Sequence, residues 1–384
     1  MRGRVPRRVL VHHVRALAAL VVVGCLAAIV VPDVASPDSD RQRAQASYAG
    51  MQRYFYRRAL SLYAEAFPAR PDERYAQLWP FSQALGATVR LAQLQPGRTS
   101  RASVYARLRA LERYWDGSQN PGGYATRPFP RAGLALQYYD DNAWVGLELV
   151  QVSRLYNDHK ALLRAAQLFT LISRGWDLDR SKLCPGGVFW ARNTAIRDRN
   201  TVSTARASQL GAQLYLETKS RHFLRWAAVM YNWVKSCLAA PNGLFWDHIE
   251  IDGQVDQRQW SYNQGAMVSA GVALYAATRN ARYLADAEDV AEAAVASLDP
   301  FAGSAEPPYF LAIFFHDLWS LTELVPSVRF ETSIRAYADQ VWTNDRDPTT
   351  GLFRFQADAG RTQLLEQAAM VQIYGDLAMH SASR

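Results

Sequence analysis

The sequence is poor in cysteine, and this narrows the classes of protein to which it can belong. Three of the 384 residues are cysteine, too few for a small scaffold held together by many disulfide bonds. Beyond the N-terminal segment only Cys184 and Cys237 remain. Two interpretations of this pair stay open: a bridge formed in an oxidising compartment, or two buried free thiols.

Sequence motifs for metals and common cofactors are also absent. Histidines stand singly along the chain, without the spacing of a zinc site, at His159, His222, His248 and His316. The sequence contains no Gly-x-Ser-x-Gly elbow, no phosphate-binding loop and no dinucleotide fingerprint. We therefore predict neither a metal site nor a cofactor.

Lysine is nearly absent, so arginine carries most of the positive charge. The lysines are Lys160, Lys182, Lys219 and Lys235. The formal net charge is +8, but five of these charges come from arginines among the first fifteen residues, which include no acid. The rest of the chain has no basic stripe with interleaved aromatic residues, so we exclude nucleic acid as a partner.

The N-terminus has the pattern of an export signal. After the basic segment, an uncharged apolar run spans residues 16–31 and ends at Pro32. Its length leaves a cleaved signal and a retained membrane anchor both open. The sequence around Cys25 also resembles a lipoprotein cleavage site. We expect a signal or anchor with a short linker over residues 1–40, one exported domain over residues 41–384, and a location in the cell envelope or outside the cell.

An internal repeat organises the exported part. The pairs Leu155-Tyr156, Leu214-Tyr215 and Leu274-Tyr275 follow one another at 59 and 60 residues. Each pair stands near the end of one helical pattern and is followed by a polar turn and a second helical pattern. A period of this length is typical of a repeated supersecondary unit. Each unit is therefore predicted to be a helical hairpin.

Apolar periodicity predicts about a dozen helices and no large sheet. They are expected to start near residues 42, 79, 101, 142, 159, 203, 221, 261, 280, 309, 327 and 362, and proline and glycine clusters separate several of them. Six hairpins that close into a ring form an all-α (α/α)6 barrel. An open solenoid is the alternative arrangement of the same units.

Polar residues mark the expected starts of the inner helices. These starts are Asp140-Asp141, Asn200, Tyr262-Asn-Gln-Gly265 and Trp79. A polar residue at such a position can simply cap the helix, and this interpretation suits Asn200. Two successive aspartates exceed what one cap needs, so Asp140 and Asp141 are candidate catalytic residues.

A pair of carboxylates suits the hydrolysis of glycosidic bonds. That chemistry needs one ionised carboxylate as base or nucleophile and one protonated carboxyl as acid. Two like charges close together push their pKa values apart, which allows one partner to keep its proton. Aromatic residues, 12% of the chain, could stack on sugar rings beside the pair. Core packing is the alternative role for these aromatics, which are Tyr138, Tyr139, Trp144, Trp190, Trp246, Trp260 and Tyr262.

The segment Tyr138-Tyr-Asp-Asp-Asn-Ala-Trp144 resembles the catalytic motif of glycoside hydrolase family 76, the endo-α-1,6-mannanases. Further motifs follow in the family's order: Gly122-Gly-Tyr124, Gly186-Gly-Val-Phe-Trp190, Asn200-Thr-Val-Ser-Thr-Ala205, Asn242-Gly-Leu-Phe-Trp-Asp247 and Trp260-Ser-Tyr-Asn-Gln-Gly265. The resemblance covers about residues 45–380. One departure is Phe310-Leu-Ala-Ile-Phe314, where the family tends to have Phe-Lys-Gly-Ile-Phe.

The resemblance implies an (α/α)6 barrel and retaining hydrolysis without a metal. It implies that Asp140 is the nucleophile and Asp141 the general acid/base. The residues expected to bind substrate are Tyr139, Asn142, Trp190, Asn200, Asp247, Tyr262, Asn263 and Gln264. The expected substrate is an α-1,6-linked mannan or a mannosylated glycolipid, and the protein is expected to be a monomer. The alternatives are a transglycosylase that uses the same covalent intermediate and a non-catalytic glycan-binding ring.

Overall fold

The computed structural model describes residues 39–132, 135–298, 306–355 and 360–381. The signal or anchor with its linker is predicted for residues 1–40, and residues 1–38 of it lie outside the described part of the chain. Twelve α-helices form the described part of the chain. The even-numbered ones are α2 (Leu78–Leu94), α4 (Tyr139–Tyr156), α6 (Thr201–Thr218), α8 (Ser261–Thr278), α10 (Pro308–Thr322) and α12 (Leu364–Ser381). The odd-numbered ones are α1 (Asp40–Tyr54), α3 (Arg98–Leu111), α5 (His159–Ser173), α7 (Arg221–Cys237), α9 (Ala281–Leu298) and α11 (Val328–Asn344).

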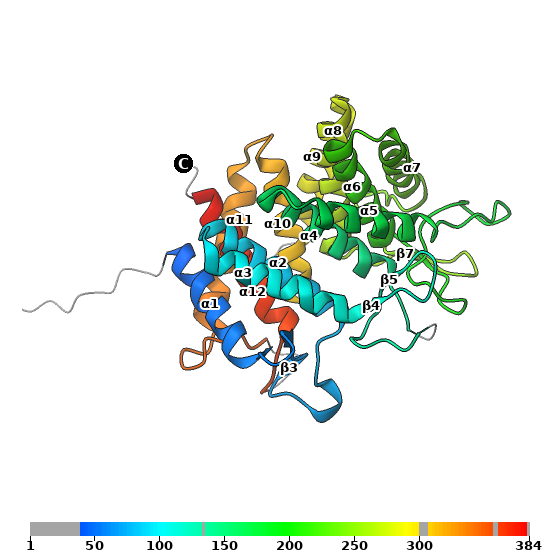
Figure 1. Cartoon of the computed structure of the whole chain (residues 1–384). Helices are drawn as coiled ribbons and strands as arrows, with labels where there is room; N and C mark the ends of the chain where they lie inside the picture. The colour runs from blue at the N-terminus through cyan, green and yellow to red at the C-terminus, as the bar shows by residue number, and fades with distance from the viewer. Residues whose placement is uncertain (1–38, 133–134, 299–305, 356–359, 382–384) are drawn as a thin grey trace, which may run out of the picture. The chain divides into compact units, whose positions relative to one another are not determined.

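The even-numbered helices close into an inner ring. Each packs against the next from α2 to α12, and α12 packs back against α2. The odd-numbered helices lie outside this ring, and α5, α7 and α9 pack mainly on α4, α6 and α8 (Figure 1). Helix α1 packs on α12, so the two ends of the domain meet. The predicted (α/α)6 barrel is confirmed, and the open solenoid is wrong.

The apolar pattern explains which helices are inner and which are outer. Most residues of α2, α8 and α12 are buried, and many are small, so neighbouring inner helices approach closely. Outer helices are amphipathic, and α7 buries one stripe that includes Met230, Tyr231 and Val234. All twelve helices begin within three residues of the starts predicted from the sequence.

The ends of the inner helices do not follow the spacing of the Leu-Tyr pairs. Helices α4, α6 and α8 end at residues in the left-handed conformation: Asn157, Lys219 and Arg279. These caps lie 62 and 60 residues apart. Leu155-Tyr156 lies in the last turn of α4, whereas the later Leu-Tyr pairs lie about one turn before the ends of their helices. The spacing of 59 residues therefore misaligns the first unit by three residues.

The connections into the inner helices contain short two-residue strands. These pair as β1 (Tyr56–Arg57) with β2 (Leu62–Tyr63), β3 (Ala66–Phe67) with β9 (Thr362–Gln363), β4 (Trp115–Asp116) with β5 (Gly123–Tyr124), and β6 (Arg199–Asn200) with β7 (His248–Ile249) and β8 (Val255–Asp256). Two 3-10 turns, Pro71–Glu73 and Glu112–Tyr114, complete the described elements. The strands fix the connections that carry the polar residues described below.

The fourth residue of four inner helices holds the connection before it. In α4 and α8, side-chain amides accept a hydrogen bond from one backbone N–H of the preceding segment and donate to its carbonyls. Thr204 of α6 accepts from the N–H of Val188 at 3.0 Å, and Gln367 of α12 accepts from Phe353 at 3.2 Å. We call this contact the connection clamp. It satisfies backbone groups that would otherwise be buried without partners.

Cys184 and Cys237 form a disulfide bond. It joins the connection between α5 and α6 to the last residue of α7. Of the two interpretations left open by the sequence, the structure supports the bridge.

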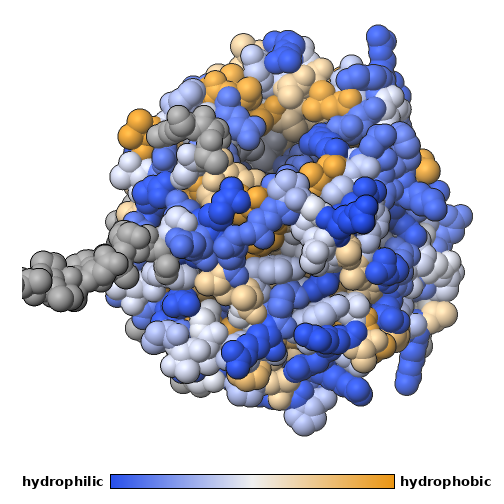
Figure 2. All heavy atoms as spheres, turned by 60° about the vertical axis from the view of Figure 1, so that its left-hand side comes forward, coloured by the Kyte–Doolittle hydropathy of each residue, from blue (hydrophilic) through white to orange (hydrophobic). Residues whose placement is uncertain are grey.

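One face of the described domain is mainly hydrophilic. Figure 2 shows a face on which hydrophilic residues predominate and hydrophobic ones are scattered between them. Among the described residues, no helix combines the length and apolar character needed to cross a bilayer.

Candidate active site

The two candidate aspartates lie at the N-terminal end of an inner helix. Asp140 and Asp141 are the second and third residues of α4. One carboxylate oxygen of Asp140, Oδ2, accepts a hydrogen bond from Nε1 of Trp190 at 3.1 Å. Its other oxygen, Oδ1, is buried and has no side-chain hydrogen-bond partner among the described residues. Asp141 is 8% exposed. The pair is therefore largely shielded from solvent.

Burial keeps protons on both carboxyl groups at a higher pH than usual. It raises the pKa of Asp140 to about 7, although the Trp190 N–H and the backbone N–H groups of Asp140 and Asp141 favour the ionised form. The pKa of Asp141 lies well above its usual range because of burial and because of the neighbouring charge of Asp140. Asp140 is thus the first of the pair to ionise, and Asp141 holds its proton longer.

Trp190 borders the aspartates and is open to solvent. Its side chain is 39% exposed. The Tyr138 ring lies beside it, with ring centroids 4.8 Å apart, and the Tyr139 N–H donates to the Trp190 carbonyl at 2.9 Å. These contacts fix the indole against the start of α4. An exposed indole next to two carboxyl groups can stack on a sugar ring.

A second polar group lies at the start of α8. Asp247 accepts hydrogen bonds from Nδ2 of Asn263 at 2.7 Å and from the Tyr262 hydroxyl at 3.3 Å. Oδ1 of Asn263 is buried and has no partner among the described residues. Burial raises the pKa of Tyr262 well above its usual value, and the charges of Asp247 and Asp140 raise it further. The Tyr262 hydroxyl is therefore close enough for both carboxylates to change its pKa.

Asn200 connects the two groups. It pairs with His248 between strands β6 and β7, and the N–H of Thr201 donates to the Asp247 carbonyl at 2.8 Å. Asn200 occupies the residue before α6, but its side chain makes no capping hydrogen bond. Its Oδ1 is buried and lacks a partner in the described part of the chain. The capping role considered for this side chain is therefore wrong, and the oxygen is free to bind a ligand.

The sequence profile of glycosyl hydrolase family 76 matches residues 40–384. The chain belongs to this family. A mannan endo-1,6-α-mannosidase of Candida glabrata is 27% identical over 269 residues, which are 61% of this family 76 chain and 59% of that protein. The chain therefore matches less than two-thirds of the length of this relative.

Solved structures from family 76 share the fold. A glycoside hydrolase (mannosidase) of Bacteroides thetaiotaomicron has a TM-score of 0.80 and 21% identity, over 90% of this chain and all of that one. An inactive variant of an α-1,6-mannanase from a Salegentibacter species, with two aspartates replaced and α-1,6-mannotriose bound, has a TM-score of 0.74 and 20% identity. It covers 89% of this chain and 99% of that one.

Three residues expected to bind substrate are internal in this family 76 chain. Asn142 is fully buried, and its amide is bonded to the backbone of Tyr124 and Tyr138. Gln264 is also fully buried, and its amide is bonded to the backbone of Phe245 and Trp260. Both residues form connection clamps, which uses their hydrogen-bonding capacity, so we no longer expect them to contact a sugar.

Tyr139 is the third internal residue. It is 6% exposed, and its ring lies against Gly175, where an added Cβ would be 2.6 Å from the ring. Its side chain therefore packs beneath the connection that follows α5. The expectation of a substrate contact is not supported by this position.

The sequence analysis missed Asp198. Its charge raises the pKa of Asp140, Tyr138 and His248, so it lies within electrostatic reach of both halves of the site. Its backbone carbonyl accepts a hydrogen bond from the backbone N–H of Trp190 at 2.9 Å. The available signal was an acidic residue two positions before the polar start of an inner helix.

An aromatic cluster at the same end of the ring was also missed in part. Phe310, at the start of α10, contacts Trp79 of α2, Tyr262 of α8 and two further rings, Trp260 and Tyr309. The Phe310 and Tyr262 centroids are 4.3 Å apart. These rings join the starts of three inner helices and give the site an apolar side.

Asp247, His248 and Asp256 place possible metal-ligand atoms within 4.8 Å of one another. The imidazole of His248 already contacts carboxylates through both nitrogens: Asp247 at 2.9 Å and Glu250 at 3.0 Å. The hydrogen bond to Asp247 helps to raise the pKa of His248 to about 9 despite its burial. Such an imidazolium has no free lone pair for a metal ion, so the group fits an ion-pair network better.

Proposed function

We propose that this chain is a retaining glycoside hydrolase that cleaves α-1,6-mannosidic linkages in a mannan or a mannosylated glycolipid. The fungal relative is named as a mannan endo-1,6-α-mannosidase. The Salegentibacter α-1,6-mannanase was obtained as an inactive variant by replacing two aspartates with consecutive numbers. Both names agree with a chain whose adjacent aspartates lie at the start of an inner helix.

The observation that carries the proposal is the inequality of the two carboxyl groups. Asp140 is stabilised as an anion by the Trp190 indole and by backbone N–H groups. Asp141 is buried, and the neighbouring charge of Asp140 further disfavours its ionisation. One group is thus suited to attack a carbon atom and the other to donate a proton, which is the division of roles in a retaining glycosidase.

In the first step, the Asp140 carboxylate attacks the anomeric carbon of the sugar. The glycosidic C–O bond breaks, and Asp141 transfers its proton to the leaving oxygen. In the second step, Asp141 takes a proton from water, whose oxygen attacks the same carbon and releases Asp140. Two displacements at one carbon give net retention, so the first product from an α-mannoside is the α-anomer.

The polar group beyond the aspartates is proposed to hold the sugar. The free oxygens of Asn200 and Asn263 can accept hydrogen bonds from sugar hydroxyls. Asp247, which also accepts a hydrogen bond from the Tyr262 hydroxyl, holds Asn263 in place, and the exposed Trp190 indole offers a stacking surface. This arrangement combines hydrogen-bond acceptors with aromatic faces, as sugar binding requires.

Export to the cell envelope is part of the proposal. The Cys184–Cys237 disulfide agrees with an oxidising compartment outside the cytosol.

Incubation with linear α-1,6-mannan tests the proposal. We expect shorter oligosaccharides on product sizing and the α-anomer as the first signal in proton NMR. An Asp140→Asn variant should give no products, whereas Asp289→Asn, the same change on the exposed face of α9, should behave as the parent. An initial β-anomer would show that Asp140 is not a nucleophile. Products longer than the substrate would indicate transglycosylation instead.

A further inference from the structure

A large cavity of the described domain lies inside the inner ring, and neither Asp140 nor Asp141 lines it. Its volume is about 710 Å³. Five inner helices line it, and on α4 and α6 the lining residues recur at the spacing of one helix face, as on α4 at Trp144, Leu147, Glu148, Gln151 and Arg154. This is the inward stripe of a helix. From Trp144 to Arg154 the stripe spans about 15 Å along the axis. We call this space the distal chamber.

A floor separates the distal chamber from the aspartates. The Arg206 guanidinium lies 4.2 Å from the centre of the Trp144 ring. It donates to both oxygens of Asp317 and, at 3.0 Å, to the Ser269 hydroxyl. These four residues come from α4, α6, α8 and α10, and Trp144 lies one turn beyond Asp141 on α4. Neither Asp140 nor Asp141 lines the chamber, which is therefore a different site.

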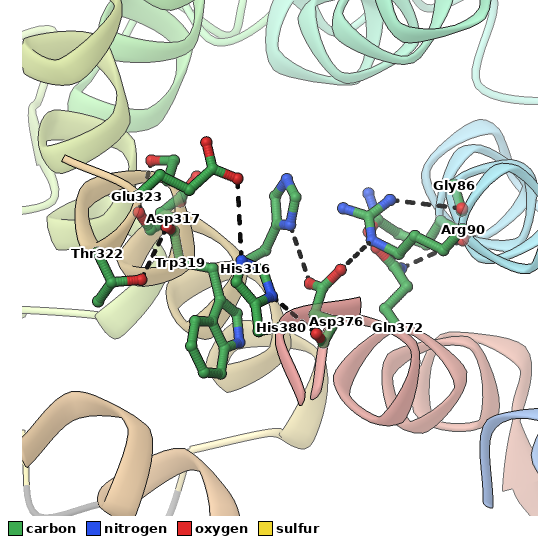
Figure 3. Close-up of polar contacts among 12 residues, drawn as sticks. Gly86, Arg90, His316, Asp317, Trp319, Thr322, Glu323, Gln372, Asp376 and His380 are labelled. Carbon is green, nitrogen blue, oxygen red and sulfur yellow. Dashed lines mark hydrogen bonds and ion pairs between the residues drawn. The ribbon is translucent and has the colours of Figure 1, made fainter. Parts of the chain in front are cut away.

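Charges in the chamber are compensated by one another. Arg90 contacts Asp376 at 3.0 Å and Glu148 at 3.5 Å, and His316 contacts the other oxygen of Asp376 at 2.9 Å (Figure 3). Burial opposes ionisation of Asp376, but Arg90 and His316 lower its pKa to about 2. His380 contacts Glu323 at 3.8 Å. The chamber thus has no strong excess of either charge with which to select an ion.

Neutral hydrogen-bonding groups remain available. Gln151 and Gln213 are partly buried, line the chamber from adjacent helices, and have no side-chain hydrogen bond within the described chain. Gln93 lines its exposed end. Two indoles, Trp144 and Trp319, form part of the wall. Amides both donate and accept, and indoles pack against C–H groups, so the lining matches a ligand with many hydroxyls and no charge.

We propose that the distal chamber is a second binding site for a neutral mono- or disaccharide. Its volume falls within the range of small-molecule sites. A charged ligand would have to displace the existing ion pairs, and an apolar one would leave the amides without partners. The choice of a mannose disaccharide as the probe rests on the proposed function, whereas the chamber itself does not.

The test counts bound molecules of radiolabelled α-1,6-mannobiose by equilibrium dialysis. The full chain carries Asp140→Asn, which prevents turnover. We expect two molecules per chain. A Gln151→Leu and Gln213→Leu double variant should weaken one of the two sites at least tenfold. Gln167→Leu, the same change on the exposed face of α5, should leave both sites unchanged. In chains that keep Asp140, the double variant should hydrolyse mannan with the parent's kcat and KM.

Gln93→Trp provides a second variant that does not touch the interior. It narrows the exposed end of the chamber and should also weaken one site without lowering the melting temperature. One molecule per chain in the parent, or two unchanged sites in both chamber variants, would overturn the proposal. Two sites in a chain that fails to hydrolyse mannan would overturn the proposed function and support the chamber.

Discussion

The two ends of the inner ring hold buried carboxylates in opposite electrostatic surroundings. At the N-terminal end, burial raises the pKa of Asp140 and Asp141, and no cation is paired with either among the described residues. Towards the other end, Arg90 and His316 overcome the effect of burial and hold Asp376 as an anion. The same type of side chain is thus proposed to react at one end and is held in an ion pair at the other. In this domain, a buried carboxyl group without a paired cation marks the candidate catalytic residues, whereas one with a paired cation stabilises the fold.

The largest expected effect is on activity. Asp140→Asn should lower kcat for mannan about 10⁴-fold or more, because no covalent intermediate can form. Asp141→Asn should spare the first step for aryl mannosides with good leaving groups, which need no proton. A burst of released aryl group followed by slow turnover would show this. Steady turnover of the Asp140→Asn variant at the parental rate would contradict the assignment.

Asp376→Asn should affect stability instead. It leaves the Arg90 guanidinium without its closest counter-charge and should lower the free energy of unfolding by about 3–5 kcal/mol. Asp141→Asn should not destabilise the protein, because the replaced group has no paired cation. Guanidinium unfolding at pH 7 compares the two variants. An equal loss of stability in both would remove the distinction between the two ends.

Two amides at the start of α8 provide a smaller contrast. Gln264→Ala removes a connection clamp and leaves buried backbone groups unpaired, so it should cost about 1–3 kcal/mol of stability. Asn263→Ala should instead weaken turnover of mannan with little change in the unfolding curve. Measuring both quantities on both variants checks the assignment. A folded Asn263→Ala variant with the parent's turnover would show that this amide does not bind substrate.

The contrast between the two ends also extends to the pH dependence of stability. The folded pKa of Asp140 is raised to about 7, above its unfolded value of about 3.9, so the parent loses stability as the pH rises between these values. Asp140→Asn should therefore gain in melting temperature over the parent from pH 4 to pH 7. The folded pKa of Asp376 is lowered to about 2, so the parent's advantage over Asp376→Asn should shrink below pH 4. Parallel curves across pH 3–8 would contradict both pKa shifts.

The fold could be predicted because its signal is repeated many times. Each helix has an apolar stripe, and the breakers between helices are proline and glycine. The register was harder to predict, because a helical pattern looks similar after a shift of three or four residues. Leu155-Tyr156 illustrates this, since only the left-handed cap at Asn157 shows where the unit ends.

Part of the site could be predicted and part could not. Asp140 and Asp141 stand out because two successive carboxylates exceed what one helix start needs. Asn142 and Gln264 have the chemistry of sugar ligands, but their amides are bonded to the backbone. Such a contact depends on a loop segment about 20 residues away in sequence. The distal chamber depends on five inward stripes that meet only after the ring has closed.

Closure of the ring by α12 sets the order in which the chain can fold. Arg90 meets Asp376 across 286 residues, and the Gln367 amide donates to the carbonyl of Ser47 across 320 residues. Contacts between such distant segments are slow to form. During synthesis, helices α1 and α2 therefore lack one neighbour until α12 has been translated. The ring is completed only after α12 has left the ribosome. A chain truncated before Leu364 should expose the apolar faces of α1, α2 and α10 on which α12 packs.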